Sequence, residues 1–205
     1  MEVTVHQARI QRLLIDAIAI VAVAGLAVEI AQDGLGFDDP YDLVDLFSLS
    51  YEENIPTWLS AGLHATSAIL LALIASGKQQ TGAPYVRHWW ALSVVFTYIS
   101  IDELVQIHEE MSNWDINDRF VDLVPDSLAG ALYFSWVIPA AIMVSIFVLS
   151  YVRFLIHLPR ITSVRFIRAG AVFVGGALGI ELFLGYWTDL YGRSNLGYAL
   201  IDWVE

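Results

Sequence analysis

The stretch Tyr98-Ile-Ser-Ile-Asp102-Glu103-Leu-Val-Gln106-Ile-His108-Glu109-Glu110 decides how the whole chain is interpreted. It completes an apolar run that begins at His88, and it then sets carboxylates, a glutamine and a histidine side by side. Ionisable side chains at the end of a membrane span are costly to place there, so they are functional candidates by default.

Helical spacing sorts these side chains into faces. Asp102, Gln106 and Glu109 recur at i, i+4 and i+7, which predicts that they share one face of the helix. Glu103 is predicted on the adjoining face. His108 is predicted to point away from both faces if the helix stays regular.

The composition predicts an all-α, polytopic transmembrane helical bundle. Of the 205 residues, 57% are hydrophobic and only 16% are charged, whereas an ordinary soluble domain carries about 25% charged residues. The mean hydropathy is +0.61. Apolar runs near the length that crosses a bilayer predict five spans and the start of a sixth within a single domain, residues 1–205. They lie at about 13–31, 54–75, 88–106, 128–149 and 169–187, with the sixth beginning at about 198.

Composition also excludes several classes of function. The chain has no cysteine, which excludes disulfides, thiolate metal sites and cysteine catalysis. Its net charge of -12 argues against nucleic-acid binding. The first apolar run is longer than the core of a cleavable signal peptide, so we expect no cleavage.

Local signals place some boundaries and bends. Asn54 is predicted to cap the second span, with Pro56 in its first turn. Pro139 is predicted to kink the fourth span. Gly175 and Gly179 form a G-x-x-x-G, which predicts the close approach of another helix. Residues 41–49 are predicted to be either a short interfacial helix or a solvated acidic loop.

The basic residues predict the orientation. All Lys and Arg except Arg119 and Arg193 lie in the amino-terminal segment, the 78–87 loop and the 153–168 turn. The positive-inside rule therefore predicts a cytoplasmic amino terminus and an outer face that carries most of the acidic residues.

Once the topology is fixed, acidic residues from distant parts of the sequence converge at the outer ends of the spans. They are Glu29, Glu53 with His64 below it, Asp102 to Glu109, Glu181, Asp202 and Glu205. Buried like charges repel and each costs several kcal/mol, roughly, to desolvate. We therefore expect a cation, shared protons or water in an open cavity to compensate them.

A metal ion is the sharpest of these expectations. Carboxylates with imidazole suit iron, manganese or zinc, and helical bundles hold such ions in their cores. The chain lacks the Glu-x-x-His of di-iron bundles, because Val105 stands three residues before His108. Two other interpretations stay open: a frayed helix end with solvated acids, and a proton-sharing or substrate-binding cavity without metal.

Three segments carry a resemblance: Asn54-Ile-Pro-Thr-Trp58-Leu-Ser60, Ala83-Pro-Tyr-Val-Arg87-His-Trp-Trp90, and Ser100-Ile-Asp102-Glu103 with His108-Glu109. Together they resemble an uncharacterised family of bacterial multi-pass membrane proteins, which implies the bacterial inner membrane. The resemblance implies one set of metal-site residues, Asp102, Glu103, His108, Glu109, Glu181 and Glu205, to which the convergence above adds Glu53 and His64. The chain departs from the family pattern by ending at Glu205, before a final span is complete.

Two functions are predicted from these observations. The first is a metal or carboxylate site in the outer leaflet that acts on a lipid-soluble substrate; whether it is an enzyme is left open. The alternative is an accessory subunit that packs against a larger membrane complex. Expected partners are membrane lipid and either other membrane subunits or further copies of the chain, and we expect the isolated 205-residue chain not to be a stable monomer.

Overall fold

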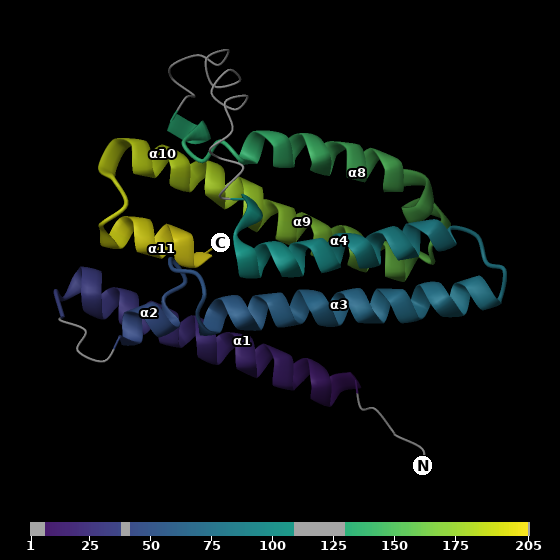
Figure 1. Cartoon of the computed structure of the whole chain (residues 1–205), viewed down its shortest axis with the longest axis horizontal. Coiled ribbons are helices and arrows are strands. Elements are labelled where there is room, and N and C mark those ends of the chain that lie inside the picture. Colours follow the sequence, from purple (N-terminus) through teal and green to yellow (C-terminus); the bar gives the residue numbers. More distant parts are fainter. Residues whose placement is uncertain (1–6, 38–41, 109–129, 205) are drawn as a thin grey trace.

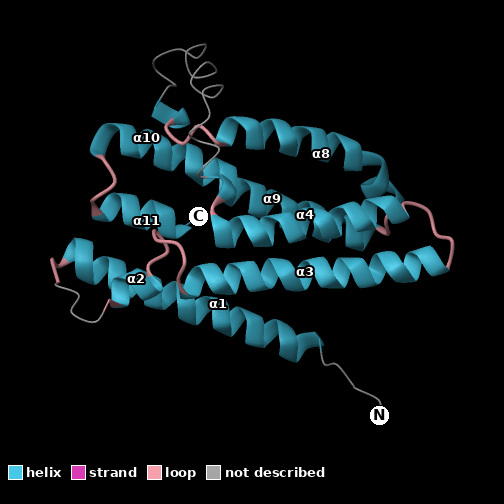
Figure 2. Cartoon of the chain, viewed as in Figure 1, coloured by secondary structure: helices cyan, strands magenta, loops and turns pink. Residues whose placement is uncertain are grey.

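The computed structural model is all-helical in the part of the chain that it describes, residues 7–37, 42–108 and 130–204. Long helices lie side by side with alternating direction, and short helices gather at one end (Figures 1 and 2). The helices are α1 (Gln7–Glu29), α2 (Leu43–Phe47), α3 (Ile55–Gln80), α4 (Val86–Val105), α8 (Val137–His157), α9 (Arg160–Val174), α10 (Glu181–Tyr191) and α11 (Leu196–Val204). Two π-helical segments, η1 (Ile30–Gly34) and η3 (Gly175–Ile180), extend α1 and join α9 to α10, and a 3-10 turn, η2 (Gly130–Leu132), precedes α8.

Four of the described helical stretches are long and apolar enough to cross a membrane: Gln7–Gly34, Ile55–Gln80, Val137–His157 and Arg160–Tyr191. Helix α4, which covers the predicted third span, is not among them. Helix α11 has nine residues, whereas a crossing takes about 20. The predicted count of five spans and the start of a sixth is therefore not confirmed, although the all-helical class is.

Helices α3 and α4 form a close antiparallel hairpin. Ala61, Ala68 and Ala75 recur every seven residues on the buried face of α3, and such small side chains let two helices approach. Ser93 Oγ donates to the Ala68 carbonyl at 2.8 Å, and Ser100 Oγ donates to the Ala61 carbonyl at 2.8 Å. These two bonds fix the register of α4, and with it the position of the acidic stretch at its end.

The start of α3 confirms the predicted cap. The Asn54 side chain accepts from Thr57 N at 3.2 Å, and Pro56 lies in the first turn. Asn54 is buried, and its amide nitrogen also donates to the carbonyls of Ser48 and Tyr51. One residue thus starts α3 and anchors the segment that precedes it.

Two local predictions are wrong. Pro139 lies in the first turn of α8, where its missing N–H has no helical partner to lose, so it causes no kink. No helix of the described residues packs on Gly175 or Gly179, because a Cβ added at either would meet nothing within 4 Å. Both glycines instead belong to the π segment η3. The short helix predicted in residues 41–49 is present as α2.

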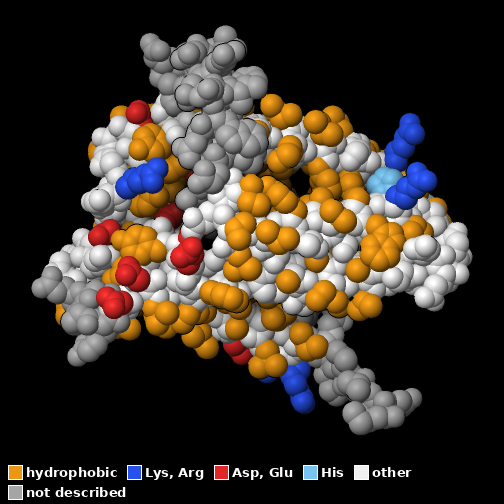
Figure 3. Space-filling view, in the orientation of Figure 1, with side chains coloured by type: hydrophobic (Ala, Val, Ile, Leu, Met, Phe, Trp, Pro, Cys, Tyr) orange, Lys and Arg blue, Asp and Glu red, His pale blue; other side chains and the backbone are white. Residues whose placement is uncertain are grey.

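The ends of the bundle differ in charge. The α3–α4 and α8–α9 turns lie at one end, which we call the basic end, whereas residues 48–54 and the ends of α1 and α4 lie toward the other, the acidic end (Figure 1). Figure 3 shows Lys or Arg side chains and a His at the basic end, on the right, and most of the visible Asp and Glu on the left, where a Lys or Arg side chain also lies. This separation matches the segregation of charge in the sequence.

Candidate functional site

The end of α4 folds back on itself and brings His108 against Asp102. Gln106 adopts the left-handed conformation, with φ 58°, and donates its N–H to the Asp102 carbonyl at 2.7 Å. The chain then turns, so that His108 N donates to Asp102 Oδ1 at 2.9 Å and His108 Nδ1 lies 3.2 Å from Asp102 Oδ2. The prediction that His108 points away is wrong because the helix ends at Val105.

The other imidazole nitrogen faces a second carboxylate. His108 Nε2 lies 3.7 Å from Glu52 Oε1, in the segment before α3. The His108 ring also meets the Trp136 ring edge-on, with centroids 5.1 Å apart. Since Asp102 lies against Nδ1, a proton on Nδ1 points to Asp102, and Nε2 faces the Glu52 carboxylate.

Trp136 links the Asp102–His108 pair to Glu181. The indole Nε1 donates to Glu181 Oε1 at 3.1 Å. Glu181 is only 9% exposed and is the first residue after the π segment η3. A π segment shifts the helical register, and such segments are frequent at functional sites.

A second buried carboxylate also adjoins a π segment. Glu29, 4% exposed, ends α1 directly before η1, and it accepts a hydrogen bond from Ser48 Oγ. Ser48 is fully buried, and its Oγ also accepts from Ser50 N at 3.0 Å. The segment before α3 is therefore tied to the end of α1.

Asp202, on α11, lies between these carboxylates. Burial raises its pKa from 3.8 to about 6, against a smaller opposing effect of the Ser50 side chain. The charges of Glu181 and Glu29 raise this pKa further, and Arg193 lowers it. Helix α11 is held in place by Trp203, whose Nε1 donates to the Ala22 carbonyl of α1 at 2.8 Å.

These residues make one polar cluster from parts of the chain that are distant in sequence. We call it the acidic cluster; its members are Glu29, Ser48, Ser50, Glu52, Asp102, His108, Trp136, Glu181 and Asp202. Among the described residues, its carboxylates outnumber the cations near it, which are His108, when protonated, and Arg193. The cluster therefore favours bound protons or another cation.

The predicted site residues fall into three groups. Asp102, His108 and Glu181 belong to the acidic cluster. Glu103 is instead close enough to His64 for its charge to act on that imidazole, and the His64 ring lies between Phe96 and Phe173.

The remaining predicted residues are outside the cluster or cannot be placed. Glu53 is exposed and has a left-handed backbone. Glu109 and Glu205 lie outside the described residues. Within the described ranges, no three His, Asp or Glu side chains are arranged to hold a metal ion.

Sequence reasoning missed Trp136 and gave Glu52 no role. Trp136 lies within the apolar run 128–149, so nothing in its neighbours marks it as a partner of Glu181. Glu52 adjoins Glu53 in an acidic loop, and only the fold of residues 48–54 selects the first of the two.

The fold and cluster define a helical protein with several helices apolar enough to span a membrane and a carboxylate–imidazole cluster that includes two buried glutamates. The chain belongs to a family described as a domain of unknown function, DUF8692, which matches residues 13–205. No curated protein and no solved structure matches the chain.

Proposed function

We propose that the protein is an integral membrane protein whose acidic cluster is an acid–base site for a lipid-soluble substrate. The observation that carries this proposal is the double contact of Asp102 with His108, at the backbone N–H and at Nδ1. A carboxylate placed this way fixes both the orientation and the tautomer of an imidazole. His108 Nε2 is then the atom that accepts and returns a proton.

The roles follow from the contacts. Asp102 is a positioning residue, because it holds the imidazole and stabilises its protonated form. Glu52 Oε1, 3.7 Å from Nε2, is within ion-pair distance, so its charge also stabilises the protonated imidazole. Asp202 holds a further proton nearby, and its raised pKa supports that role.

Asp102→Asn is the direct test of this site. Removing the negative charge destabilises the imidazolium, so we expect His108 to lose its proton about one pH unit lower than in the wild type. NMR titration of histidine-labelled protein measures this, and His108→Gln identifies the resonance. His64→Gln, at the histidine that lies between Phe96 and Phe173, is the matched control and should leave the His108 curve unchanged. An unchanged His108 titration curve in Asp102→Asn would contradict the proposed role of Asp102 in holding the imidazole.

A metal site remains the second candidate, supported by the 3.7 Å approach of His108 Nε2 and the Glu52 carboxylate. Iron, manganese or zinc suits this donor pair, with Glu109 and Glu205 as the predicted further ligands. Elemental analysis of the purified protein separates the candidates. A stoichiometric metal that is lost in His108→Gln favours the metal site, and its absence favours proton exchange.

We also propose that the acidic end faces outward in a bacterial inner membrane, with the amino terminus in the cytoplasm. The absence of cysteine makes this testable with single cysteines. Thr81, in the α3–α4 turn, and Ser194, between α10 and α11, are both exposed. A membrane-impermeant maleimide should label the Ser194→Cys protein in intact cells and the Thr81→Cys protein only after lysis. Labelling of both in intact cells would overturn this orientation.

The alternative, an accessory subunit, stays a prediction. Stoichiometric co-purification of a larger membrane protein, together with a His108→Gln variant that keeps full function, would favour it over the acid–base site.

A further inference from the structure

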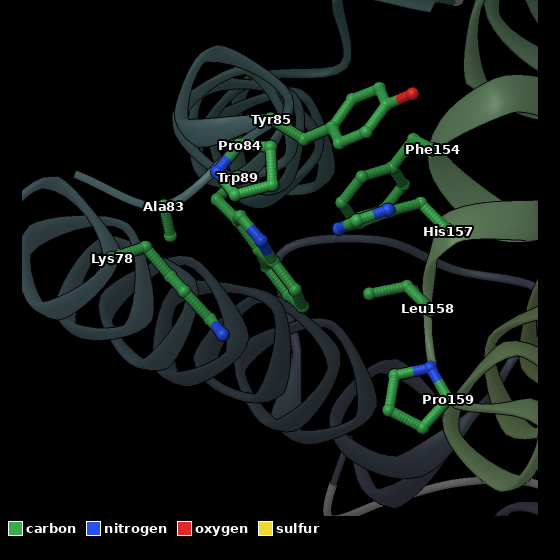
Figure 4. Close-up of a pocket in the computed structure, with 9 residues that line it drawn as sticks. All are labelled: Lys78, Ala83, Pro84, Tyr85, Trp89, Phe154, His157, Leu158 and Pro159. Carbon is green, nitrogen blue, oxygen red and sulfur yellow. The ribbon is translucent and has the colours of Figure 1, made fainter. Parts of the chain in front are cut away.

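A pocket opens at the basic end, between the α3–α4 turn and the α8–α9 turn. It measures about 350 Å³ including its mouth, and it is lined chiefly by Lys78, Tyr85, Trp89, Phe154, His157 and Pro159. Figure 4 shows Lys78 and His157 on opposite sides of this pocket, with the Trp89 indole between them. The pocket lies at the opposite end of the bundle from the acidic cluster, so it does not depend on the function proposed above.

The walls of the pocket are fixed by packing. Trp89 is 6% exposed and Phe154 is fully buried, and their rings meet edge-on with centroids 5.1 Å apart. The Tyr85 ring lies 4.9 Å from the His157 ring. Tyr151 OH also donates to the His88 carbonyl at 2.8 Å, which joins α8 to α4 behind the pocket. The two helical pairs thus form a preorganised aromatic floor.

The helices around the pocket carry positively charged side chains that no acidic side chain in the same segments balances. Residues 54–101 and 127–180 contain no Asp or Glu, yet they contain Lys78, Arg87, Arg153, Arg160, Arg165 and Arg168. Within the described residues, no Lys or Arg forms an ion pair. An anion that neutralises this end must therefore come from outside the described chain.

We propose that this pocket binds the phosphate head group of an anionic phospholipid. Lys78 and His157 are exposed at the pocket, so their nitrogens are available to donate to the phosphate oxygens. Tyr85 and Trp89 provide the amphipathic surface that aromatic side chains offer at the head-group level of a bilayer.

The position of the pocket favours a lipid over a soluble phosphate. It lies at the ends of α3 and α8, both apolar enough to cross a membrane. Ile156 and Ile161, which bracket the α8–α9 turn, are 78% and 71% exposed. An acyl chain attached to a head group in the pocket can pack on such apolar surface. Basic pockets between membrane helices bind anionic head groups in this way.

Native mass spectrometry of the full chain tests the proposal, with phosphatidylglycerol and phosphatidylcholine offered in equal amounts. We expect retained phosphatidylglycerol adducts on the wild type and an affinity about tenfold lower in the Lys78→Gln/His157→Gln variant, because each change removes a donor to a charged group. Arg168→Gln removes a charge from the same end without touching the pocket, and it should bind as the wild type does. Unchanged melting temperatures without anionic lipid show that the variants are folded, as expected for exposed side chains.

Three results would overturn the proposal. An equal loss of binding in Arg168→Gln would mean that diffuse charge attracts the lipid. Equal retention of phosphatidylcholine would mean that the head-group charge is not recognised. Stabilisation of the wild type by inorganic phosphate to the same degree as by phosphatidylglycerol, abolished in the double variant, would assign the pocket to a soluble phosphate.

Discussion

Asp202→Asn is expected to stabilise the folded protein by about 3 kcal/mol at about pH 7.5 and to flatten its stability between about pH 4 and 8. The raised pKa of Asp202 means that folding favours its protonated form. The carboxyl therefore contributes fully to stability below 3.8, its ordinary pKa, and this contribution is lost as the pH rises through about 6. Asparagine stays neutral throughout, so the variant avoids this loss.

Thermal unfolding in detergent across this pH range measures the effect. The charged groups that face Asp202 are Glu29 on α1, Glu181 on α10 and Arg193, and all three are kept in the variant. Asp45→Asn, at an exposed position on α2, is the matched control and should leave the pH profile of the wild type unchanged. If Asp202→Asn instead kept the wild-type slope, another member of the acidic cluster would hold the proton.

The helices could be predicted from the sequence because each depends on neighbours along the chain. The Asn54 cap needs only Thr57, three residues on, and the apolar runs need only their own composition. The segregation of most Lys and Arg from Asp and Glu is likewise a property of the linear sequence, and the two ends of the bundle keep it in large part.

The details of the site depend on turns that helical periodicity cannot represent. The prediction for His108 assumed a regular helix, but Gln106 takes a left-handed backbone that favours glycine, and this single residue reverses the chain. No turn signal of glycine, proline or asparagine stands in residues 102–108. The contact of Asp102 with His108 therefore replaced the predicted shared face of Asp102 and Gln106, and Glu109 lies outside the described residues.

Side-chain contacts between segments that are distant in the sequence could not be predicted either. Glu181 was recognised as a buried acid, but its donor, Trp136, comes from 45 residues away. The two π segments adjoin Glu29 and Glu181, and no periodicity in the sequence marks either of them. Convergence of acids could thus be predicted from topology, whereas their partners required the fold.

Sequence motifs also did not show which glycines are tightly packed. The packing seen in the structure leads to a second prediction with a large expected effect. The G-x-x-x-G at Gly175 and Gly179 meets no neighbour in the part of the chain that the structure describes, whereas Gly25, which stands in no such motif, makes a tight contact. A Cβ added at Gly25 would lie 2.8 Å from the Phe47 carbonyl oxygen and would overlap the Leu49 side chain. Leu49 can turn away, but the carbonyl belongs to the backbone, so the segment after α2 would have to move.

Gly25→Ala is therefore expected to destabilise the protein by about 3 kcal/mol, at the upper end of the cost of overpacking. Gly170→Ala is the matched control: it too is helical, a Cβ there meets nothing within 4 Å, and alanine favours a helix by up to about 1 kcal/mol over glycine. Unfolding midpoints in the same detergent compare the two. A Gly25→Ala protein as stable as the control would show that α2 does not pack on α1 as described.

We expect Gly25→Ala to disturb the acidic cluster as well, through Ser48. Ser48 follows Phe47 directly and donates to Glu29, which lies one helical turn after Gly25. If Gly25→Ala displaces this segment, the hydrogen bond is already broken, and a further Ser48→Ala change has little left to remove. Because sites that share a backbone shift are not additive, Ser48→Ala should cost about 1–3 kcal/mol in the wild type and much less in Gly25→Ala. Equal costs in both backgrounds would mean that the cluster and the α1–α2 contact are independent.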